Sequence, residues 1–179
     1  MVDIQIRGEI WDNDSSEVLR WLGWRDLTCP NDIAKALEAA GGDEVTVLVN
    51  SPGGDLFSGA EIRSMLRRYN GRTEALIQGY AASAATVAIS ACDVIRCESG
   101  GLCCYHNPVS TAEGDYRDMS GASKSLKNAR DTILDAYLAR PVCKTTREEL
   151  AALMDKDIFI TPTPVSYTHL RAHETAANL

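Results

Sequence analysis

At 179 residues, the chain is long enough to bury one hydrophobic core and too short for two ordinary domains. A formal charge of −7 without a cluster of Lys and Arg excludes the basic surface that nucleic-acid binding requires. No apolar run approaches the ~20 residues that cross a bilayer, and the N-terminal residues show no signal-peptide pattern. We therefore expect a cytoplasmic protein that binds neither nucleic acid nor membrane.

The first half of the sequence alternates strand and helix patterns. Residues 4–8 alternate apolar and polar side chains, and residues 45–49 form a β-branched run typical of a buried parallel strand. An N-cap signal at residues 29–32 begins a helix that the following Gly-Gly pair closes, and residues 57–66 form an amphipathic helix. Residues 11–28 are polar with scattered Trp and Leu, and we assign no regular element to them.

The second half continues in the same order, with strands expected at residues 73–78, 93–97 and 102–105, a largely buried helix at 84–91 and a long amphipathic helix at 116–138. A capping box from Thr145 to Glu148 begins a short helix that runs to about Met154. This order of strands and helices predicts a parallel-strand α/β fold whose ligands bind at the carboxyl ends of the strands.

Residues 162–179 differ in kind from the rest of the chain. They contain two prolines, no sustained periodicity and two of the three histidines, and they resemble translated adaptor or cloning read-through. We therefore take residues 1–161 as the domain and expect a non-native or disordered tail; the alternative is a native, irregular tail.

The six cysteines form no CxxC pair, and the chain is not of the small secreted type. They are Cys29, Cys92, Cys97, Cys103, Cys104 and Cys143. We predict reduced, largely buried thiols and no bound metal or other cofactor.

The residues that could carry chemistry begin with Ser83, which lies between a strand pattern and an alanine-rich helix pattern. Such a junction presents the Ser83 hydroxyl at an edge and points the Ala84 N–H into the same space, which is the logic of a nucleophile elbow. Gly53 and Gly54 follow a buried strand, and their backbones can approach a substrate closely. We assign the oxyanion hole to Gly54 and Ala84 and substrate contacts to Gly53 and Asp55.

A serine nucleophile needs a base that titrates near neutrality, and His106 is the histidine outside the tail. It follows a predicted strand and precedes Asn107-Pro108, which should hold it in a turn. Asp157 is the first candidate for the carboxylate that orients it, and Asp155 is the second. Each residue alone has an ordinary structural explanation, so the hypothesis depends on their occurring together.

Four segments, in this order, resemble the proteolytic subunit of the Clp protease family: residues 49–55, 79–85, 106–108 and 155–161. The resemblance implies the ClpP/crotonase fold, an α/β fold of repeated ββα units with a projecting long helix. It implies homo-oligomeric rings, hexameric or heptameric and single or stacked, that act on polypeptides. It also implies a Ser-His-Asp triad, with Ser83 as nucleophile, His106 as base and Asp157 as the orienting acid.

Within that family, residues 55–59 and the insertion around residues 11–24 resemble the phage or prophage type, which implies processing of capsid or scaffold proteins during head maturation. Housekeeping members carry a segment before the first strand that forms pore loops, whereas this sequence reaches Ile4 at once. This leaves open whether the enzyme is ATP-independent or assisted by an AAA+ unfoldase. After Thr161 the family's usual helix and strand are replaced by the tail, so we expect an incomplete wall beside Asp157.

The leading prediction is a self-compartmentalising serine endopeptidase. One alternative is a non-catalytic ring subunit with an assembly role, which the altered C-terminus would favour. The other is an acyl-CoA enzyme of the crotonase type, because that fold also stabilises an oxyanion with two backbone N–H groups.

Overall fold

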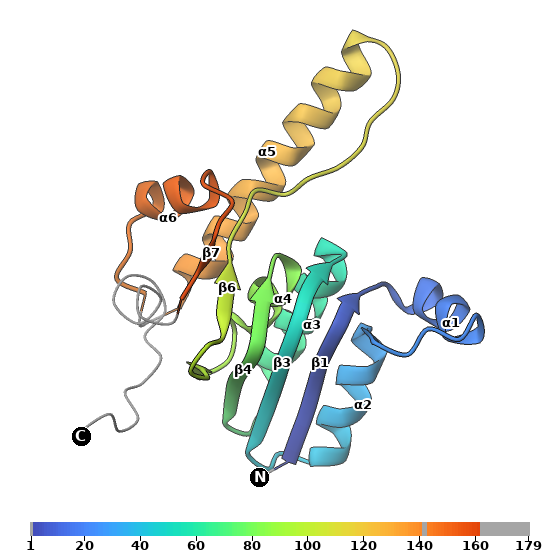
Figure 1. The fold of residues 1–179 in the computed structure, drawn as a ribbon, viewed down its shortest axis with the longest axis vertical. Helices are drawn as coiled ribbons and strands as arrows, with labels where there is room; N and C mark the ends of the chain where they lie inside the picture. The colour runs from blue at the N-terminus through green and yellow to red at the C-terminus, as the bar shows by residue number, and fades with distance from the viewer. Residues whose placement is uncertain (1, 141–142, 162–179) are drawn as a thin grey trace.

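The computed structural model describes residues 2–140 and 143–161, which form one seven-stranded sheet with helices packed against it (Figure 1). In chain order the elements are β1 (Val2–Ile10), α1 (Asn13–Trp21), β2 (Leu27–Thr28), α2 (Pro30–Ala40), β3 (Val45–Gly54), α3 (Leu56–Arg68), β4 (Thr73–Ala82), α4 (Ala84–Ile89), β5 (Val94–Cys97), β6 (Leu102–Cys104), α5 (Tyr116–Leu138), α6 (Arg147–Met154) and β7 (Phe159–Ile160). The strand order is β2-β1-β3-β4-β6-β7, and β5 also pairs with β4. All pairings are parallel except that of β6 with β7. The predicted α/β class with mainly parallel strands is confirmed.

The core lies between the central strands and helices α2, α3 and α4, which pack on one another and on the sheet. Ile6, Val47, Ile62 and Ile77 expose 1% of their surface or less. Buried residues are nearly consecutive along β3, as expected for a central parallel strand that is covered on both faces. The β-branched run in the sequence therefore marks the middle of the sheet.

Local signals bound helix α2 as predicted. The Asp32 carboxylate accepts a hydrogen bond from the Cys29 N–H at 3.0 Å, and Pro30 occupies the first turn, where no backbone donor is needed. Gly41 ends the helix with φ 59°, a left-handed conformation that glycine adopts without strain.

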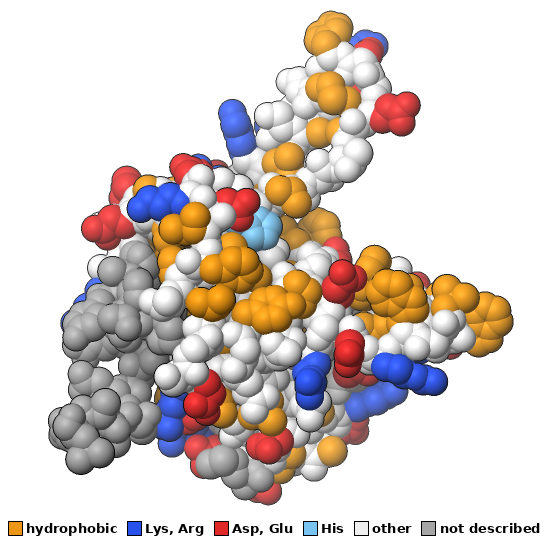
Figure 2. Space-filling view, in the orientation of Figure 1, with side chains coloured by type: hydrophobic (Ala, Val, Ile, Leu, Met, Phe, Trp, Pro, Cys, Tyr) orange, Lys and Arg blue, Asp and Glu red, His pale blue; other side chains and the backbone are white. Residues whose placement is uncertain are grey.

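Helix α5 is the long helix predicted from the sequence, with the same bounds. Asp115 caps it by accepting two backbone N–H groups, and only the C-terminal part is buried, at Ile133, Leu134 and Tyr137. The N-terminal part extends away from the sheet as an arm, with the segment that follows β6 running beside it (Figure 1). Hydrophobic side chains are spread along this arm and over the α1 end of the molecule (Figure 2).

Residues 11–28 contain two elements that sequence reasoning did not assign, α1 and β2. The Asp12 carboxylate caps α1 by accepting from the Ser15 N–H at 2.9 Å. The helix buries only Ser16, while Trp21 is 84% exposed. The apolar residues Val18, Trp21 and Leu22 lie on an exposed side of α1, so the helix does not contribute them to the core.

Further bounds differ from the predictions. β3 runs to Gly54 and β4 to Ala82, beyond the predicted ends at residues 49 and 78, because their pairing with neighbouring strands continues through these residues. The capping box of α6 is formed by Thr146 and Glu149 rather than Thr145 and Glu148, so the helix begins one residue later than predicted. Helix α4 ends at Ile89 instead of residue 91, and the short strand β7 was not predicted. The predicted tail, residues 162–179, lies outside the described residues.

The six cysteines are free thiols, four of them buried, whereas Cys97 and Cys143 are half-buried. Burial raises the pKa of the Cys92 thiol to about 12, so it stays protonated. Within residues 2–140 and 143–161, no helix combines the length and apolar character needed to span a bilayer.

Replacing Ile62 by Ala should lower the free energy of unfolding by about 2–5 kcal/mol, because it leaves a cavity in the core. Phe57→Ala, on the same helix, removes a larger side chain that is 81% exposed, and should change stability by less than about 0.5 kcal/mol. Urea unfolding followed by tryptophan fluorescence checks both. Equal losses in the two variants would contradict the assigned packing of α3.

Candidate active site

The carboxyl ends of β3, β4 and β6 meet at one edge of the sheet, where a cavity of about 490 Å³ opens. Its lining includes Gly54, Asp55, Ser83, Ala84 and His106, each of which sequence reasoning had singled out. Three separate strand ends thus bring together residues that are up to 52 positions apart in the sequence, from Gly54 to His106.

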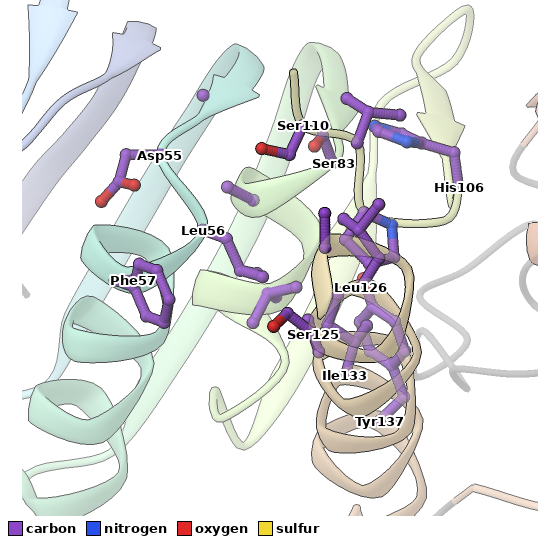
Figure 3. A pocket seen from close by; sticks show the side chains of 17 residues that line it. Asp55, Leu56, Phe57, Ser83, His106, Ser110, Ser125, Leu126, Ile133 and Tyr137 are labelled. Carbon is purple, nitrogen blue, oxygen red and sulfur yellow. The ribbon is translucent and has the colours of Figure 1, made fainter. Parts of the chain in front are cut away.

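Ser83 occupies the junction between β4 and α4, with φ 55° and ψ −128°, a conformation that residues other than glycine seldom adopt. The Ser83 N–H donates to the Cys104 carbonyl at 3.1 Å, and the Thr86 hydroxyl donates to the Ser83 carbonyl at 2.6 Å. A strained strand-to-helix turn of this kind turns its side chain outward. Figure 3 shows Ser83 at the cavity, with the His106 side chain extending from the end of β6 toward the same turn.

The Gly53-Gly54 segment packs directly on the Ser83 turn. It is the carboxyl end of β3, paired with Glu9 and Ile10 of β1, and does not follow the strand as predicted. Gly53 has φ 88°, and a Cβ there would lie 2.5 Å from the Ala82 carbonyl oxygen and 2.8 Å from the Ala84 nitrogen. Only glycine therefore fits without displacing the Ser83 turn. Gly53 is buried rather than part of the cavity lining, so its closest neighbours are the turn itself.

The two backbone N–H groups on either side of Gly54 are already hydrogen-bonded within the protein, which limits the donors that a ligand could use. The Gly53 N–H donates to the Ser51 hydroxyl at 3.1 Å, and the Asp55 N–H donates to the Ile10 carbonyl at 2.8 Å. Gly54 lies between these two occupied donors and is exposed on the cavity. Ala84 is the first residue of α4, where a backbone N–H has no acceptor within its own helix.

Asp55, predicted to contact substrate, has a second role in the structure. Its carboxylate accepts from the Ser58 N–H at 2.8 Å and from the Ser58 hydroxyl at 2.6 Å, which caps α3. It lies at the rim of the cavity, half-buried.

His106 follows β6 by two residues and is half-buried. Its Nδ1 lies 2.6 Å from the carbonyl oxygen of Asn107. Because a carbonyl only accepts, this hydrogen bond requires a proton on Nδ1, which leaves Nε2 without a proton in the neutral ring. In the described part of the chain, the structure contains no hydrogen bond between the His106 ring and the Ser83 hydroxyl.

The two candidate carboxylates, Asp157 and Asp155, are not part of the cavity lining. Asp157 is exposed, has φ 48°, and accepts a hydrogen bond from the Cys104 thiol at 3.8 Å. Burial, and then the Asp157 charge, raise the pKa of that thiol. Among the described residues, neither Asp157 nor Asp155 is hydrogen-bonded to His106; Asp155 pairs instead with Asn107 and Arg130.

The outer wall of the cavity comes from α5 and is mostly apolar, as are the two side chains contributed by α3. The described apolar lining side chains of these helices are Leu56, Phe57, Ala122, Leu126, Ala129 and Ile133. Tyr137 lines the cavity from the buried end of α5, and its hydroxyl lies 2.7 Å from the Thr86 hydroxyl. Since Thr86 donates to Ser83, the Tyr137 hydroxyl is the donor in this pair, and burial raises its pKa.

Sequence reasoning missed Thr86, Cys104, Arg130 and Tyr137, each of which contacts a predicted residue or its neighbour. Tyr137 and Arg130 are ordinary members of the amphipathic α5 pattern, and their spacing does not distinguish them from other helix positions. Thr86 and Cys104 could have been flagged only by their closeness to Ser83 and His106 in the sequence.

The structure contains no group of three or more His, Cys, Asp or Glu side chains suited to a metal ion, as far as residues 2–140 and 143–161 are concerned. In a comparison with models of protein families, residues 31–167 match the model described as Clp protease, which covers more than half of the chain. No curated protein matches this sequence.

Gly53→Ala should disrupt the Ser83 turn, whereas Gly100→Ala is a matched control. The two glycines have φ 88° and φ 90°, but a Cβ at Gly100 would meet nothing within 4 Å. Gly100→Ala should therefore cost about 1 kcal/mol of stability from backbone strain alone. Gly53→Ala should cost several times as much in urea unfolding, and equal losses would contradict the close packing of Gly53 on the Ser83 turn.

Proposed function

Because the chain belongs to the Clp protease family, a family of serine-type peptidases, we propose that it is a serine endopeptidase with Ser83 as its nucleophile. The observation that carries this proposal is that the strained Ser83 turn, the Gly53-Gly54 segment and His106 meet at one cavity. Such an arrangement suits acyl transfer, which needs a nucleophile, a base and oxyanion donors within reach of one carbonyl.

In the proposed reaction, the Ser83 hydroxyl oxygen attacks the scissile carbonyl carbon while Nε2 of His106 takes the hydroxyl proton. The backbone N–H groups of Gly54 and Ala84 stabilise the oxyanion that forms. His106 then gives its proton to the leaving amine, which leaves an acyl group on Ser83. Water, deprotonated by His106, releases the acid and restores the serine.

Asp157 is the acid that we propose to orient His106. To reach Nδ1, its carboxylate would have to exchange the Cys104 thiol for the imidazole and displace the Asn107 carbonyl. Its left-handed backbone places it in a turn between α6 and β7, next to the end of β6. Asp155 is less suited, since Asn107 and Arg130 already occupy its carboxylate.

The apolar wall of the cavity supports the proposal that the substrate is an extended polypeptide with a hydrophobic side chain next to the cleaved bond. Asp55, at the rim, is proposed to contact the peptide backbone, whereas Gly53, predicted to do the same, is buried against the Ser83 turn and is proposed to support that turn. We further propose, on the resemblance of residues 55–59 and 11–24 to the phage type, that the polypeptide is a capsid or scaffold protein.

The α5 arm supports the proposal that the enzyme works as a homo-oligomeric ring. Exposed apolar side chains on or beside this arm include Val109, Tyr116 and Met119, which are 82%, 81% and 40% exposed. A second subunit, single ring or stacked, would bury them. An AAA+ unfoldase remains a proposed partner rather than a requirement.

A non-catalytic ring subunit is the second candidate function. It is favoured by one observation, namely that neither candidate carboxylate contacts His106 in the described residues. Such a subunit would still assemble into the oligomer but would not cleave peptide bonds.

A fluorophosphonate probe should label the wild-type protein at Ser83 and should not label Ser83→Ala. Ser110→Ala is the matched control, because Ser110 lines the same cavity and should leave labelling intact. Peptide hydrolysis by Ser83→Ala should fall by at least about 10³-fold. Labelling of Ser83→Ala would refute Ser83 as the nucleophile, whereas a wild-type oligomer that the probe does not label would favour the non-catalytic subunit.

Light scattering tests the proposed assembly. The particle mass should be a multiple of the 19.4 kDa chain mass that corresponds to a ring, single or doubled. Replacing Tyr116 and Met119 by Ser should shift the mass toward smaller particles if α5 joins subunits. A fully active monomer would refute the ring.

A further inference from the structure

Three side chains from three different elements form a closed hydrogen-bonded cluster behind His106. Arg130 of α5 donates from Nε to the Asn107 side-chain oxygen at 2.8 Å and from its terminal NH2 nitrogen to Asp155 at 2.9 Å. The Asn107 amide nitrogen completes the ring by donating to the same Asp155 oxygen at 2.8 Å. The Asn107 side chain is thus held at both of its polar atoms.

This cluster determines how the Asn107 amide is oriented. The amide oxygen faces a guanidinium, which can only donate, and the amide nitrogen faces a carboxylate, which accepts. A flipped amide would set donor against donor and acceptor against acceptor, so one orientation is favoured at both ends.

Asn107 in turn contacts the histidine through its backbone, because its carbonyl oxygen lies 2.6 Å from Nδ1 of His106. We propose that Arg130 is a positioning residue for His106: together with Asp155 it fixes Asn107, whose carbonyl keeps the proton on Nδ1 and leaves Nε2 free to accept the proton of Ser83. The inference rests on the proposed roles of Ser83 and His106, and it concerns the arrangement in the structure, in which the Asn107 carbonyl and not Asp157 is the partner of Nδ1. It goes beyond the proposed function because it assigns a role to residues outside the triad.

The stability of the fold does not explain the cluster. Arg130 and Asp155 side chains retain 31% and 58% of their exposure, and an ion pair that open to water contributes at most about 1 kcal/mol. What the cluster supplies is geometry, since it joins the histidine turn to α5 and to the turn that precedes Asp157. Removing it should therefore leave a folded protein with a misplaced base.

The chain contains a matched control for this cluster. Arg147 also bridges α6 to α5, through Asp131 and Asp135, with a similar exposure of 39%. It contacts neither His106 nor Asn107 in the described structure. Arg147→Ala thus removes an ion-pair bridge between the same two helices without touching the histidine turn.

The test compares the full-length wild type with Arg130→Ala, Arg130→Lys and Arg147→Ala by 15N NMR of the imidazole rings; His106→Gln identifies the His106 signals. The neutral His106 ring should carry its proton on Nδ1 in the wild type and in Arg147→Ala, and should shift toward Nε2 in Arg130→Ala. At saturating fluorophosphonate, the labelling rate of Arg130→Ala should fall about 10- to 100-fold, with unchanged probe binding. Arg130→Lys, which has one nitrogen for two partners, should recover part of both properties.

An Nε2 proton in the wild type, or an unchanged ring and rate in Arg130→Ala, would overturn the proposal. So would the same changes in Arg147→Ala, which would show that the helix contact alone is responsible. If Arg130→Ala does not fold, Arg130→Lys decides, and wild-type behaviour of that variant counts against the proposal. A wild type that the probe does not label refutes the peptidase proposal, whereas the NMR comparison still decides the role of Arg130.

Discussion

The parallel pairing of β4 with β6 is the contact on which the candidate site depends. β4 pairs with β5 along its first half and with β6 at residues 80–82, so the nucleophile turn emerges beside the end of β6. The hydrogen bond from the Ser83 N–H to the Cys104 carbonyl extends this pairing by one residue, and His106 lies two residues after Cys104. A slip of β6 by one residue would reverse the face to which His106 points.

Helix α5 forms the outer wall of the cavity and is linked by hydrogen bonds to the turns that hold Ser83 and His106. Through Tyr137 and Thr86 it is linked to the Ser83 carbonyl, and through Arg130 it is linked to Asn107. Only the C-terminal part of α5 is buried against the sheet. The placement of Ser83 and His106 therefore depends on how the C-terminal part of this one helix packs on the sheet.

The fold was largely predictable because most elements have a buried face. A helix that packs on a core repeats its apolar residues at a period of about 3.6, as the buried C-terminal part of α5 does, whereas a central parallel strand covered on both faces has a nearly continuous apolar run, as in the middle of β3. Helix α1 buries only Ser16, and its apolar residues Val18, Trp21 and Leu22 are exposed, so it contributes almost nothing to the core. The capping box of α6 was misplaced by one residue because Thr145 and Thr146 are chemically equivalent in the sequence, and only Thr146 has the cap geometry.

The sequence by itself predicted that Ser83, His106 and Gly54 would lie at one edge of the sheet, because each lies at or just after the end of a strand in a mainly parallel sheet. Only the tertiary structure decided what lies behind His106. Asn107, Arg130 and Asp155 come from a loop, from α5 and from the end of α6, and their hydrogen bonds follow from how these elements pack. A local sequence pattern cannot show that Asn107 is hydrogen-bonded to residues 23 and 48 positions away, Arg130 and Asp155. Tertiary packing therefore decides whether a carboxylate or a carbonyl lies at Nδ1 of His106.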